Sequence, residues 1–363
     1  MSKVRLGDVC TEIFAGGDVP RDRFSEVKTE EYSVPIYANA EKDNGLYGYT
    51  DNARVFDECV TVAARGTIGF TAIRKEPFLP VVRLITVIPK QDIITLDYLY
   101  YALKNCKPKS SGTSIPQLTV PDIKSYIINL VSIDEQQKIV ERLDKISDLI
   151  ALRKQQLSKL DELIKARFVE LFGEWKSDPE PLKSFLEDIT YGFTNPMPDA
   201  EEGPWKVTAK DVVNGKVNYD TARKTTVEAF EELTAKSKPA VGDVLLTKDG
   251  TLGRCAVVEE GGICVNQSVA VLKCNNKILP KFLAILLQMP EYQREMLKNA
   301  GGGTIKHIYI TKVVDMLIMV PTISQQLEFL SFVEQTDKSK LAIQKSLDEL
   351  ETLKKSLMQE YFG

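Results

Sequence analysis

The sequence predicts an α+β chain in which two similar mixed α/β domains are separated by two long helices. Three observations indicate this class. The chain has 363 residues, which is too long for one ordinary hydrophobic core. Its two halves resemble each other at an offset of about 185–190 residues. Each half closes with a long stretch of helical periodicity that lacks proline and glycine.

The duplication rests on six short matches that occur in the same order in both halves. They pair Val60–Gly69 with Val244–Gly253, Leu96–Leu103 with Leu279–Leu286, Gly112–Ile115 with Gly302–Ile305, Glu135–Gln137 with Ser324–Gln326, Leu160–Leu163 with Leu347–Leu350, and Leu171–Gly173 with Tyr361–Gly363. Each match alone is weak. Six matches in one order, at offsets of 183–190, indicate an internal repeat.

The first part of each half mixes short β-like runs with helices. The apolar runs Val60–Ala64 and Val244–Thr247 each end in a turn that contains glycine. The apolar pattern then resumes at Phe70–Ile73 and at Cys255–Val258. This pattern predicts a hairpin-like pair of strands at the equivalent place in both halves. The polar, proline-rich stretch Ser177–Pro181 is a plausible linker into the second half.

The second part of each half is predicted to be a long helix with coiled-coil periodicity. Its apolar stripe comprises Ile139, Leu143, Ile146, Ile150, Leu157, Leu160, Ile164 and Leu171 in the first half and Ile343, Leu347, Leu350, Leu357 and Tyr361 in the second. Ser132 and Ser324 are the expected helix caps, and Gly173 and Gly363 the expected ends. The predicted segments are 1–133 and 177–323 for the mixed domains and 134–176 and 324–363 for the helices.

Four basic residues interrupt these stripes in a repeated pattern. Arg153 and Arg167 fill gaps in the first stripe, and Lys340 and Lys354 follow 187 residues later. One interpretation is that their aliphatic stems cover the edge of a helix pair while the charges reach water. The other is that they contact a partner protein or DNA phosphates.

The composition indicates a soluble globular protein. Apolar residues make up 43% of the chain and charged residues 27%. No stretch approaches the roughly 18 apolar residues of a membrane span, and the N-terminal segment has no apolar signal core. The six cysteines form no Cys-x-x-Cys pair and the chain has one histidine, which argues against the usual zinc site. We therefore expect reduced thiols, no bound metal and a cytoplasmic protein.

The charge is distributed unevenly along the chain. The net charge of −4 argues against a protein that coats DNA through bulk positive charge. However, residues 60–110 contain eight Lys or Arg against three Asp or Glu, and residues 273–312 contain seven against two. A basic patch in each half can therefore contact phosphates while the whole molecule stays acidic. Ordinary solvated surface is the alternative interpretation.

No motif for catalysis emerges. The one histidine, His307, has Gln117 at the similar place in the first half, so it has no repeated counterpart. Gly250–Gly253 lacks the lysine that follows the last glycine of a nucleotide-binding loop. Asn195–Met197 departs from an amino-methyl-transfer motif at the second proline, and Pro121–Lys124 lacks the separate acid of a nuclease core. We therefore expect no independent active site.

The arrangement resembles the specificity subunit of type I restriction-modification enzymes over nearly the whole chain. The motifs that carry the resemblance are Val4–Cys10, the turn Arg65–Gly69, the loop Ser111–Leu118, the helix start Asp134–Val140, and Thr208–Val212 and Lys248–Gly253 in the second half. No single motif is diagnostic. The duplication together with the two long helices is the feature that identifies the family.

The resemblance implies a fold, a function and partners. Each mixed domain would be a target-recognition domain that reads one half of a split site in double-stranded DNA. The two long helices would pack antiparallel and hold the domains apart. At about 1.5 Å per residue, 38 residues span roughly 57 Å, enough to set two readers one DNA turn apart. Two methyltransferase subunits with S-adenosylmethionine and two motor-nuclease subunits using ATP and Mg²⁺ would bind the chain, which would carry none of these cofactors.

Residue chemistry then supplies candidate contacts. Polar and basic side chains at loop tips can read base edges, and glycine-containing turns let the backbone approach phosphate, although an ordinary β-turn is the alternative. The DNA-binding candidates are Asn39, Lys42, Arg65, Thr67, Lys109, Ser114 and Gln117 in the first domain and Thr194, Asn195, Lys248, Thr251, Arg254, Thr304, Lys306 and His307 in the second. The candidate partner-binding residues of the helices are Arg153, Leu160, Arg167, Lys340, Leu347 and Lys354.

A different class of function is a coiled-coil adaptor that binds only proteins. It accounts for the long helices but not for two duplicated mixed domains with local positive charge. Binding to duplex DNA that weakens with salt would separate the two hypotheses.

Overall fold

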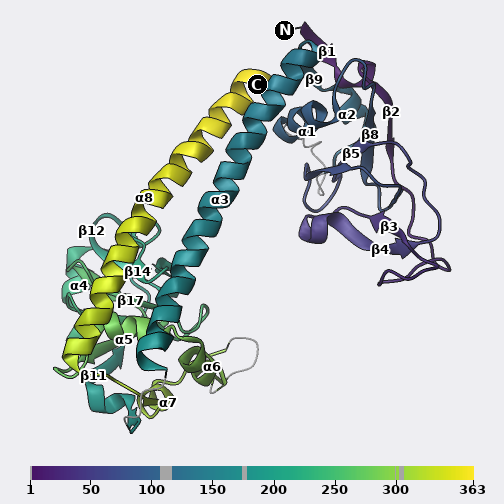
Figure 1. The fold of residues 1–363 in the computed structure, drawn as a ribbon. Coiled ribbons are helices and arrows are strands. Elements are labelled where there is room, and N and C mark those ends of the chain that lie inside the picture. Colours follow the sequence, from purple (N-terminus) through teal and green to yellow (C-terminus); the bar gives the residue numbers. More distant parts are fainter. Residues whose placement is uncertain (1, 107–116, 174–177, 299, 302–305) are drawn as a thin grey trace. The chain divides into compact units, whose positions relative to one another are not determined.

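The computed structural model describes residues 2–106, 117–173, 178–298, 300–301 and 306–363 (Figure 1). Its contacts divide the chain into two compact units. The first unit combines Met1–Gln156 with Ile343–Gly363, and the second unit is Leu157–Ala342. Each unit therefore contains one mixed domain and a part of both long helices.

In the first unit, a four-stranded antiparallel sheet has the strand order β2-β8-β5-β6 and a three-stranded sheet has the order β4-β3-β7. Strand β1 pairs with β9. The strands are β1 Ser2–Arg5, β2 Cys10–Ala15, β3 Val34–Tyr37, β4 Leu46–Thr50, β5 Cys59–Val62, β6 Thr71–Arg74, β7 Leu79–Pro80, β8 Ile85–Pro89 and β9 Ile127–Leu130. The helices before the long one are η1 Leu6–Asp8, η2 Lys42–Gly45, α1 Leu96–Asn105 and α2 Val120–Ser125.

The second unit repeats this topology. Its sheets have the orders β11-β19-β16-β17 and β15-β12-β18, and β10 pairs with β20 as β1 does with β9. The strands are β10 Glu180–Pro181, β11 Leu186–Tyr191, β12 Ala200–Val207, β13 Val212–Val213, β14 Lys216–Val217, β15 Arg223–Lys224, β16 Val244–Thr247, β17 Cys255–Val257, β18 Ile263–Val265, β19 Val269–Cys274 and β20 Leu317–Ile318. The helices are η3 Leu182–Phe185, η4 Ala209–Asp211, α4 Val227–Glu231, η5 Ala235–Ser237, α5 Pro280–Leu287, α6 Pro290–Lys298 and α7 Ile310–Val314.

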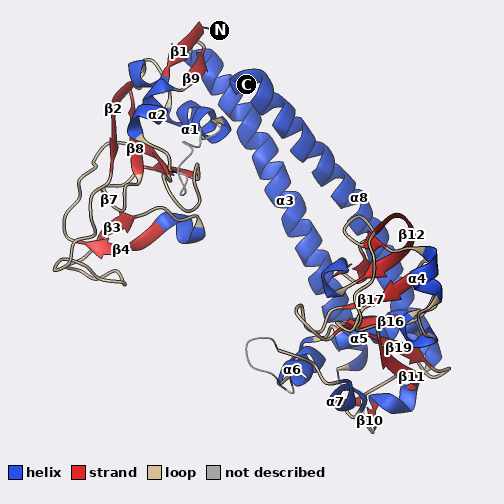
Figure 2. Cartoon of the chain, turned by 180° about the vertical axis from the view of Figure 1, so that it is seen from behind, coloured by secondary structure: helices blue, strands red, loops and turns tan. Residues whose placement is uncertain are grey.

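The duplicated apolar runs form the centre of each four-stranded sheet. Every residue of β5 and of β16 is buried, as expected for continuous apolar runs covered on both faces. The predicted hairpins are confirmed, since β5 pairs antiparallel with β6 and β16 with β17. Helices α1 and α5 lie against these hairpins, as Figure 2 shows for α5. The predicted linker is shorter than expected, because Glu180 and Pro181 pair with β20.

The two long helices are α3, Ile133–Phe172, and α8, Ile323–Phe362. At the start of α3, Ser132 Oγ accepts a hydrogen bond from the Glu135 amide at 3.4 Å, as predicted. The prediction that Ser324 caps α8 is wrong. Thr322 precedes the helix, and its amide donates to the Gln325 side chain at 3.1 Å, which leaves Ser324 inside the first turn. No helix in the described part of the chain is long and apolar enough to cross a membrane.

Within each unit the two helices pack antiparallel along the predicted stripes. In the first unit, Lys154 pairs with Glu351 at 2.8 Å and Lys354 donates to Ser147 at 2.6 Å. In the second, Lys340 pairs with Asp161 at 2.5 Å. Stripe residues are buried or half-buried, because a seam repeating every 3.5 residues keeps facing its partner helix. The predicted fold class is confirmed.

Each unit completes its core with the end of the helix that belongs to the other half. The ring of Phe362, at the end of α8, lies 4.9 Å from that of Tyr98 on α1 in the first unit. The ring of Phe172, at the end of α3, lies 5.7 Å from that of Phe282 on α5 in the second unit. Tyr98 and Phe282 occupy equivalent places, and both are fully buried. The repeat is therefore symmetric in packing as well as in sequence.

Candidate nucleic-acid interface

The same glycine turn joins the two strands of each hairpin, β5 to β6 and β16 to β17. Gly66 and Gly69 have φ values of 67° and 86°, and Gly250 and Gly253 have values of 80° and 76°. These left-handed conformations favour glycine, which explains why the glycines recur at both turns. The closing hydrogen bonds are equivalent too, with Gly69 N donating to Ala63 O at 2.9 Å and Gly253 N to Thr247 O at 2.8 Å.

A second loop docks on each turn in the same way. The amide of Leu118 donates to Ala64 O at 2.9 Å, and the amide of Ile308 donates to Lys248 O at 2.9 Å. Leu118 and Ile308 are buried, which anchors both loops. The residue before each anchor is therefore held beside the turn. In the first unit this residue is Gln117, and in the second it is His307.

The side chains at this junction differ between the halves. Arg65 donates to Gln117 Oε1 from Nε at 3.1 Å and from an Nη at 2.7 Å. In the second unit the equivalent contact joins Asp249 to His307 Nδ1 at 2.5 Å. The Lys248 ammonium also pairs with Asp249, at 2.8 Å. An exposed cation in the first unit is thus replaced by an acid that a lysine and a histidine surround.

The remaining candidates of the first unit are spread around its turn. The Asn39 side chain is committed to the backbone, since its Oδ1 accepts from Ala64 N at 2.8 Å and its Nδ2 donates to Val82 O. Lys42 is exposed in η2, and Thr67 is exposed at the tip of the turn. Lys109 and Ser114 lie outside the described residues. The structure therefore brings Asn39, Arg65 and Gln117 together and leaves Arg65 as the exposed cation of the group.

In the second unit, two further candidates also contact the backbone. Thr251 Oγ1 donates to Ala209 O at 3.0 Å, and an Nη of Arg254 donates to Val212 O at 3.4 Å. Lys306 is exposed next to His307, whereas Thr304 lies outside the described residues. Lys248 is largely covered, and its ammonium lies 5.6 Å from the centre of the Tyr191 ring. Its charge is therefore partly satisfied within the protein.

Thr194 and Asn195 lie on one wall of a cleft with a volume of about 640 Å³. This wall is the segment Tyr191–Pro198, and residues between Ala229 and Ser237 also line the cleft. The two segments meet where Thr190 Oγ1 donates to Lys236 O at 3.1 Å. Both candidate side chains are exposed, and neither makes a side-chain hydrogen bond within the described part of the chain. Glu232 and Lys236, which also line the cleft, are exposed as well. The cleft thus presents an amide, a hydroxyl, a carboxylate and an ammonium to solvent.

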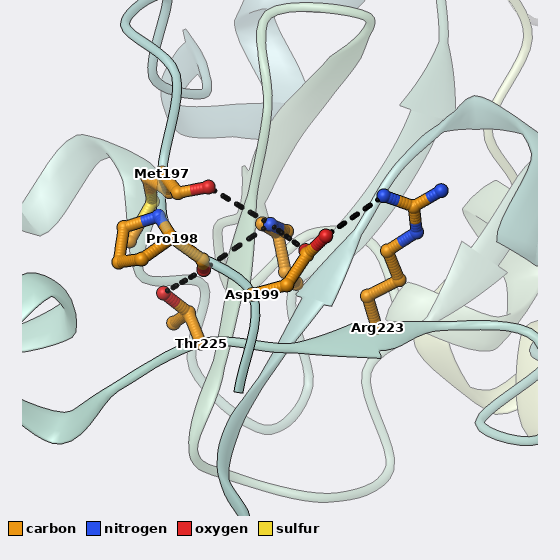
Figure 3. A network of polar contacts seen from close by, with 6 residues as sticks. Met197, Pro198, Asp199, Arg223 and Thr225 are labelled. Atoms are coloured by element: carbon orange, nitrogen blue, oxygen red, sulfur yellow. Dashed lines mark hydrogen bonds and ion pairs between the residues drawn. The ribbon is translucent and has the colours of Figure 1, made fainter. Parts of the chain in front are cut away.

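One nearly buried ammonium holds this wall in place. Lys206 on β12 donates to Met197 O at 3.2 Å, to Pro198 O at 3.3 Å and to Asp199 Oδ1 at 2.5 Å (Figure 3). Asp199 also accepts from Arg223 at 2.9 Å, and Thr225 donates to Pro198 O at 2.9 Å. The bond from Lys206 holds the pKa of Asp199 below its usual range. The wall is therefore pre-formed rather than loosely attached.

Sequence comparison decides the family. Residues 1–162 and 183–353 match the type I restriction modification DNA specificity domain. The chain belongs to this specificity family. Over 164 residues it is 37% identical to a protein of Mycoplasma pneumoniae named as type I specificity subunit S.MpnORF89P, covering 42% of this chain and 48% of the relative. Over 350 residues it is 22% identical to the EcoBI specificity subunit of Escherichia coli, covering 85% of this chain and 73% of the relative. The chain thus spans about half the length of the first of these relatives.

Solved structures of the specificity family share the fold. The S subunit of a type I restriction-modification system from M. genitalium aligns with a TM-score of 0.54 at 15% identity, over 100% of this chain and 96% of that one. A chain from a type I system, solved to explain complex assembly and conformational transition, aligns with a TM-score of 0.60 at 16% identity, over 99% and 97%. The sequence matches support the predicted family independently of the structure.

The candidate partner-binding residues occupy two kinds of place on the helices. Leu347 is buried in the helix pair and Leu160 is half-buried, so both contribute mainly to packing within this specificity-family fold. Lys340 and Lys354 bridge to the facing helix. Arg153 bonds to Gln156 at 2.8 Å, and Arg167 to Glu170 at 2.8 Å. The large apolar side chains that remain exposed lie off the predicted stripe and are Leu149, Leu152, Leu163, Val169, Leu327, Leu341 and Leu353.

Sequence reasoning missed four residues of this interface, which are Asp249, Lys206, Glu232 and Lys236. Asp249 aligns with Arg65 in the repeat, so the reversal of charge at the turn was available as a signal. Lys206, Glu232 and Lys236 gave none, because nothing in the sequence predicts that β12 runs beside Met197 or that Glu232 and Lys236 line one cleft with Asn195. Such contacts depend on long-range packing rather than on local pattern.

Proposed function

We propose that the chain is the non-catalytic specificity subunit of a type I restriction-modification complex. Each half reads one half of a bipartite site in double-stranded DNA. The observation that carries this proposal is the frame of turn and docked loop, which is built twice with equivalent backbone hydrogen bonds but carries different polar side chains. A repeated frame with diverged side chains suits two readers of different base sequences.

The proposed partners are two methyltransferase subunits, which carry S-adenosylmethionine, and motor-nuclease subunits, which use ATP and Mg²⁺. The exposed leucines on α3 and α8 leave apolar surface on the helices that a partner subunit could cover. Family membership supports the same partners.

The base-reading surface of the second half is proposed to include the cleft between Thr194 and Lys236. Asn is suited to adenine, Lys to guanine and Glu to cytosine in the major groove. Thr194, Asn195, Glu232 and Lys236 supply such groups, and the pre-formed wall keeps two of them in place. The cleft is also continuous with the turn, because Tyr191 lines it and faces Lys248.

The decisive experiment is selection of DNA from a randomised duplex library by the complete chain together with methyltransferase subunits. We expect two defined half-sites separated by a gap of fixed length and undefined sequence. Enrichment of no DNA motif, with methyltransferase still bound, would favour a protein-binding adaptor instead.

Variants then assign each half. We expect Gln117→Ala to relax one base position in one half-site, and His307→Ala or Asn195→Ala to relax a position in the other, each by about 1–3 kcal/mol of discrimination. Lys216→Ala, an exposed lysine of the second unit that does not line the cleft, is the matched control. A first-unit variant that alters both half-sites would contradict the placement of the reading surface.

The pure chain is expected to neither methylate nor cleave DNA. Incubation with labelled S-adenosylmethionine and duplex DNA, with and without methyltransferase subunits, checks this. Methyl transfer by the chain alone would refute its assignment as a non-catalytic subunit.

A further inference from the structure

A buried glutamine joins the mixed domain to the start of the long helix in each unit. We call the mixed domain the reader, and its helix α1 or α5 the reader helix. In the first unit, Gln136 Oε1 accepts from the amide of Thr95 at 2.8 Å. Its Nε2 donates to Ile93 O and to Val131 O, both at 2.9 Å. Thr95 is the residue at which helix α1 begins, and Gln136 lies in the first turn of α3. One side chain therefore ties the start of α1 to the start of α3 and to Val131, which follows β9.

The second unit contains the same junction. Gln326 Oε1 accepts from the amide of Leu279 at 2.8 Å, and its Nε2 donates to Lys277 O at 3.0 Å and to Pro321 O at 2.8 Å. Leu279 is the residue at which α5 begins. Both glutamines are completely buried. We call each set of three hydrogen bonds a glutamine clamp.

Both clamps have the same hydrogen bonds, although the number of residues between the clamped amide and the glutamine differs between the units. Thr95 and Leu279 are separated by 184 residues, whereas Gln136 and Gln326 are separated by 190. The second half therefore has six more residues between its reader helix and its long helix, yet the clamp is unchanged. The Gln-Gln match in the sequence is offset by one residue from this structural equivalence. The repeated feature is thus a spatial constraint between reader and helix rather than a local turn.

Glutamine is the side chain that fits this constraint. Its amide supplies one acceptor and two donors on one flexible stem, which matches one amide and two carbonyls. A glutamate would lose both donors and bury a charge, and an apolar side chain would leave three buried backbone groups unpaired. Other polar contacts between reader helix and long helix differ between the units. Tyr101 bonds to Asp144 at 2.5 Å in the first, and Lys281 to Asp337 at 3.2 Å in the second.

We propose that Gln136 and Gln326 are positioning residues that fix the direction of each reader on its long helix and thereby the number of base pairs between the two half-sites. The inference rests on the proposed function. Neither glutamine touches DNA, because both are buried. A shift of one base pair moves a half-site by about 3.4 Å along the DNA and by about 34–36° around it. A reader held in one direction accepts one gap length. A reader that is held less firmly also accepts gaps one base pair longer or shorter.

The test is the same selection from a randomised duplex library, carried out with the full chain and methyltransferase subunits. Gln136→Met and Gln326→Met, which keep volume but remove all three hydrogen bonds, are compared with Gln137→Met and Gln335→Met, which alter exposed glutamines of the same helices. We expect both clamp variants to keep the bases of both half-sites. The share of sites with a gap one base pair longer or shorter should rise about tenfold, as expected for a lost restraint. The two controls should keep the original gap.

The outcomes are separable. Gap lengths as narrow as in the wild type, in variants that fold, would overturn the inference, as would a changed base preference in either half-site. If Gln136→Met does not fold, Gln326→Met alone carries the test, because it removes the same three hydrogen bonds in the second unit. An unchanged gap in that variant would also overturn the inference. If the wild-type chain selects no gapped motif, the proposed function fails before any variant is compared.

Discussion

The two units share a frame but differ in what is attached to it. The four-stranded sheets, the glycine turns and the docked loops have equivalent backbone hydrogen bonds in both units, and the glutamine clamps have equivalent side-chain hydrogen bonds. The three-stranded sheets β4-β3-β7 and β15-β12-β18 keep only their strand pattern, including one parallel pair each. In the first unit a buried arginine, Arg74, holds the loop before β4 through Asn44 O at 2.7 Å. In the second unit Lys206 holds the cleft wall from a different strand.

This difference shows where the repeat tolerates change. Backbone bonds that build the frame need only the right chain direction and glycine at the turns, so they persist while side chains diverge. The two segments attached to the frame, the loop before β4 and the cleft wall, are each held by a cation of their own, Arg74 and Lys206. A loop fixed by its own internal contacts can be replaced without disturbing the sheet beneath it. The comparison therefore predicts that the two halves respond differently to equivalent substitutions.

The largest effect is expected in the aromatic core of the second unit. Phe282 packs against Phe168, Phe172 and Phe329, with ring centres 5.7–6.0 Å away. Phe282→Ala should destabilise the second unit by about 3–5 kcal/mol, because an aromatic core residue is lost and a cavity remains. At the equivalent place, Tyr98→Phe removes only the hydroxyl bond to Asn129 O at 2.8 Å and should cost about 1 kcal/mol. Denaturant unfolding would measure each loss of unfolding free energy, and hydrogen exchange would locate it. A loss below about 1 kcal/mol for Phe282→Ala would contradict the aromatic core.

The rate of thiol alkylation should be similar in both halves, and it is therefore a control for properties that differ between them. Burial raises the pKa of Cys10 and Cys59 to about 12 in the first half, of Cys255 to about 12 and of Cys264 to about 11 in the second. At pH 8 a pKa of about 12 leaves roughly a thousandfold fewer thiolates than the ordinary value. Alkylation followed by peptide mapping should therefore show slower reaction in the native protein by about a thousandfold at Cys10, Cys59 and Cys255, and by about a hundredfold at Cys264.

The pH dependence follows from the same shifts. A thiol whose pKa is raised on folding contributes stability that is fully present below its unfolded pKa of 9.0 and is lost as pH rises toward 12. Stability measured at pH 8 should therefore exceed that at pH 11. Rapid alkylation of one half at pH 8 would show that its sheet opens in the native state.

At the turns, the first half should depend more on its cation than the second. Arg65 is exposed, whereas the charge of Lys248 is already paired with Asp249. Arg65→Ala should weaken binding to all DNA sequences alike, by about tenfold, and reduce the slope of affinity against salt concentration by about 1. Lys248→Ala should have a smaller effect on both. Equal salt slopes for the two variants would mean that the ion pair with Asp249 opens on DNA.

The smallest effect is expected on the helix surface. Lys340 pairs with Asp161, which is largely exposed, so Lys340→Ala should cost about 0.5 kcal/mol. Lys154→Ala, which breaks the pair with Glu351 in the other unit, should cost as little. Thermal unfolding of both variants checks this. A loss above about 2 kcal/mol in either would mark that ion pair as part of a coupled network.

The sequence was sufficient for features that local pattern determines. The apolar runs predicted β5 and β16, the uninterrupted 4-3 stripe predicted α3 and α8, and the repeated glycines predicted the turns. The site was less accessible because its contacts join distant segments. The residue types at Asn39 and Thr251 suggested DNA contact, yet their side chains bind the backbone, and Lys206 gave no signal at all. The helix caps were predicted only in part, since Ser132 caps α3 as predicted and Ser324 does not cap α8.

The exchange of helix ends has a consequence for synthesis on the ribosome. The second unit is one continuous segment, Leu157–Ala342, whereas the first needs Ile343–Gly363 to complete it. Until residues 343–363 emerge, Tyr98 and Leu143 lack the side chains of Phe362 and Tyr361 that share their core. The half that is made first therefore finishes folding last, and its apolar surface stays open to water or chaperones while the other half closes. A stalled or truncated chain should consequently display an incomplete N-terminal half rather than a folded one.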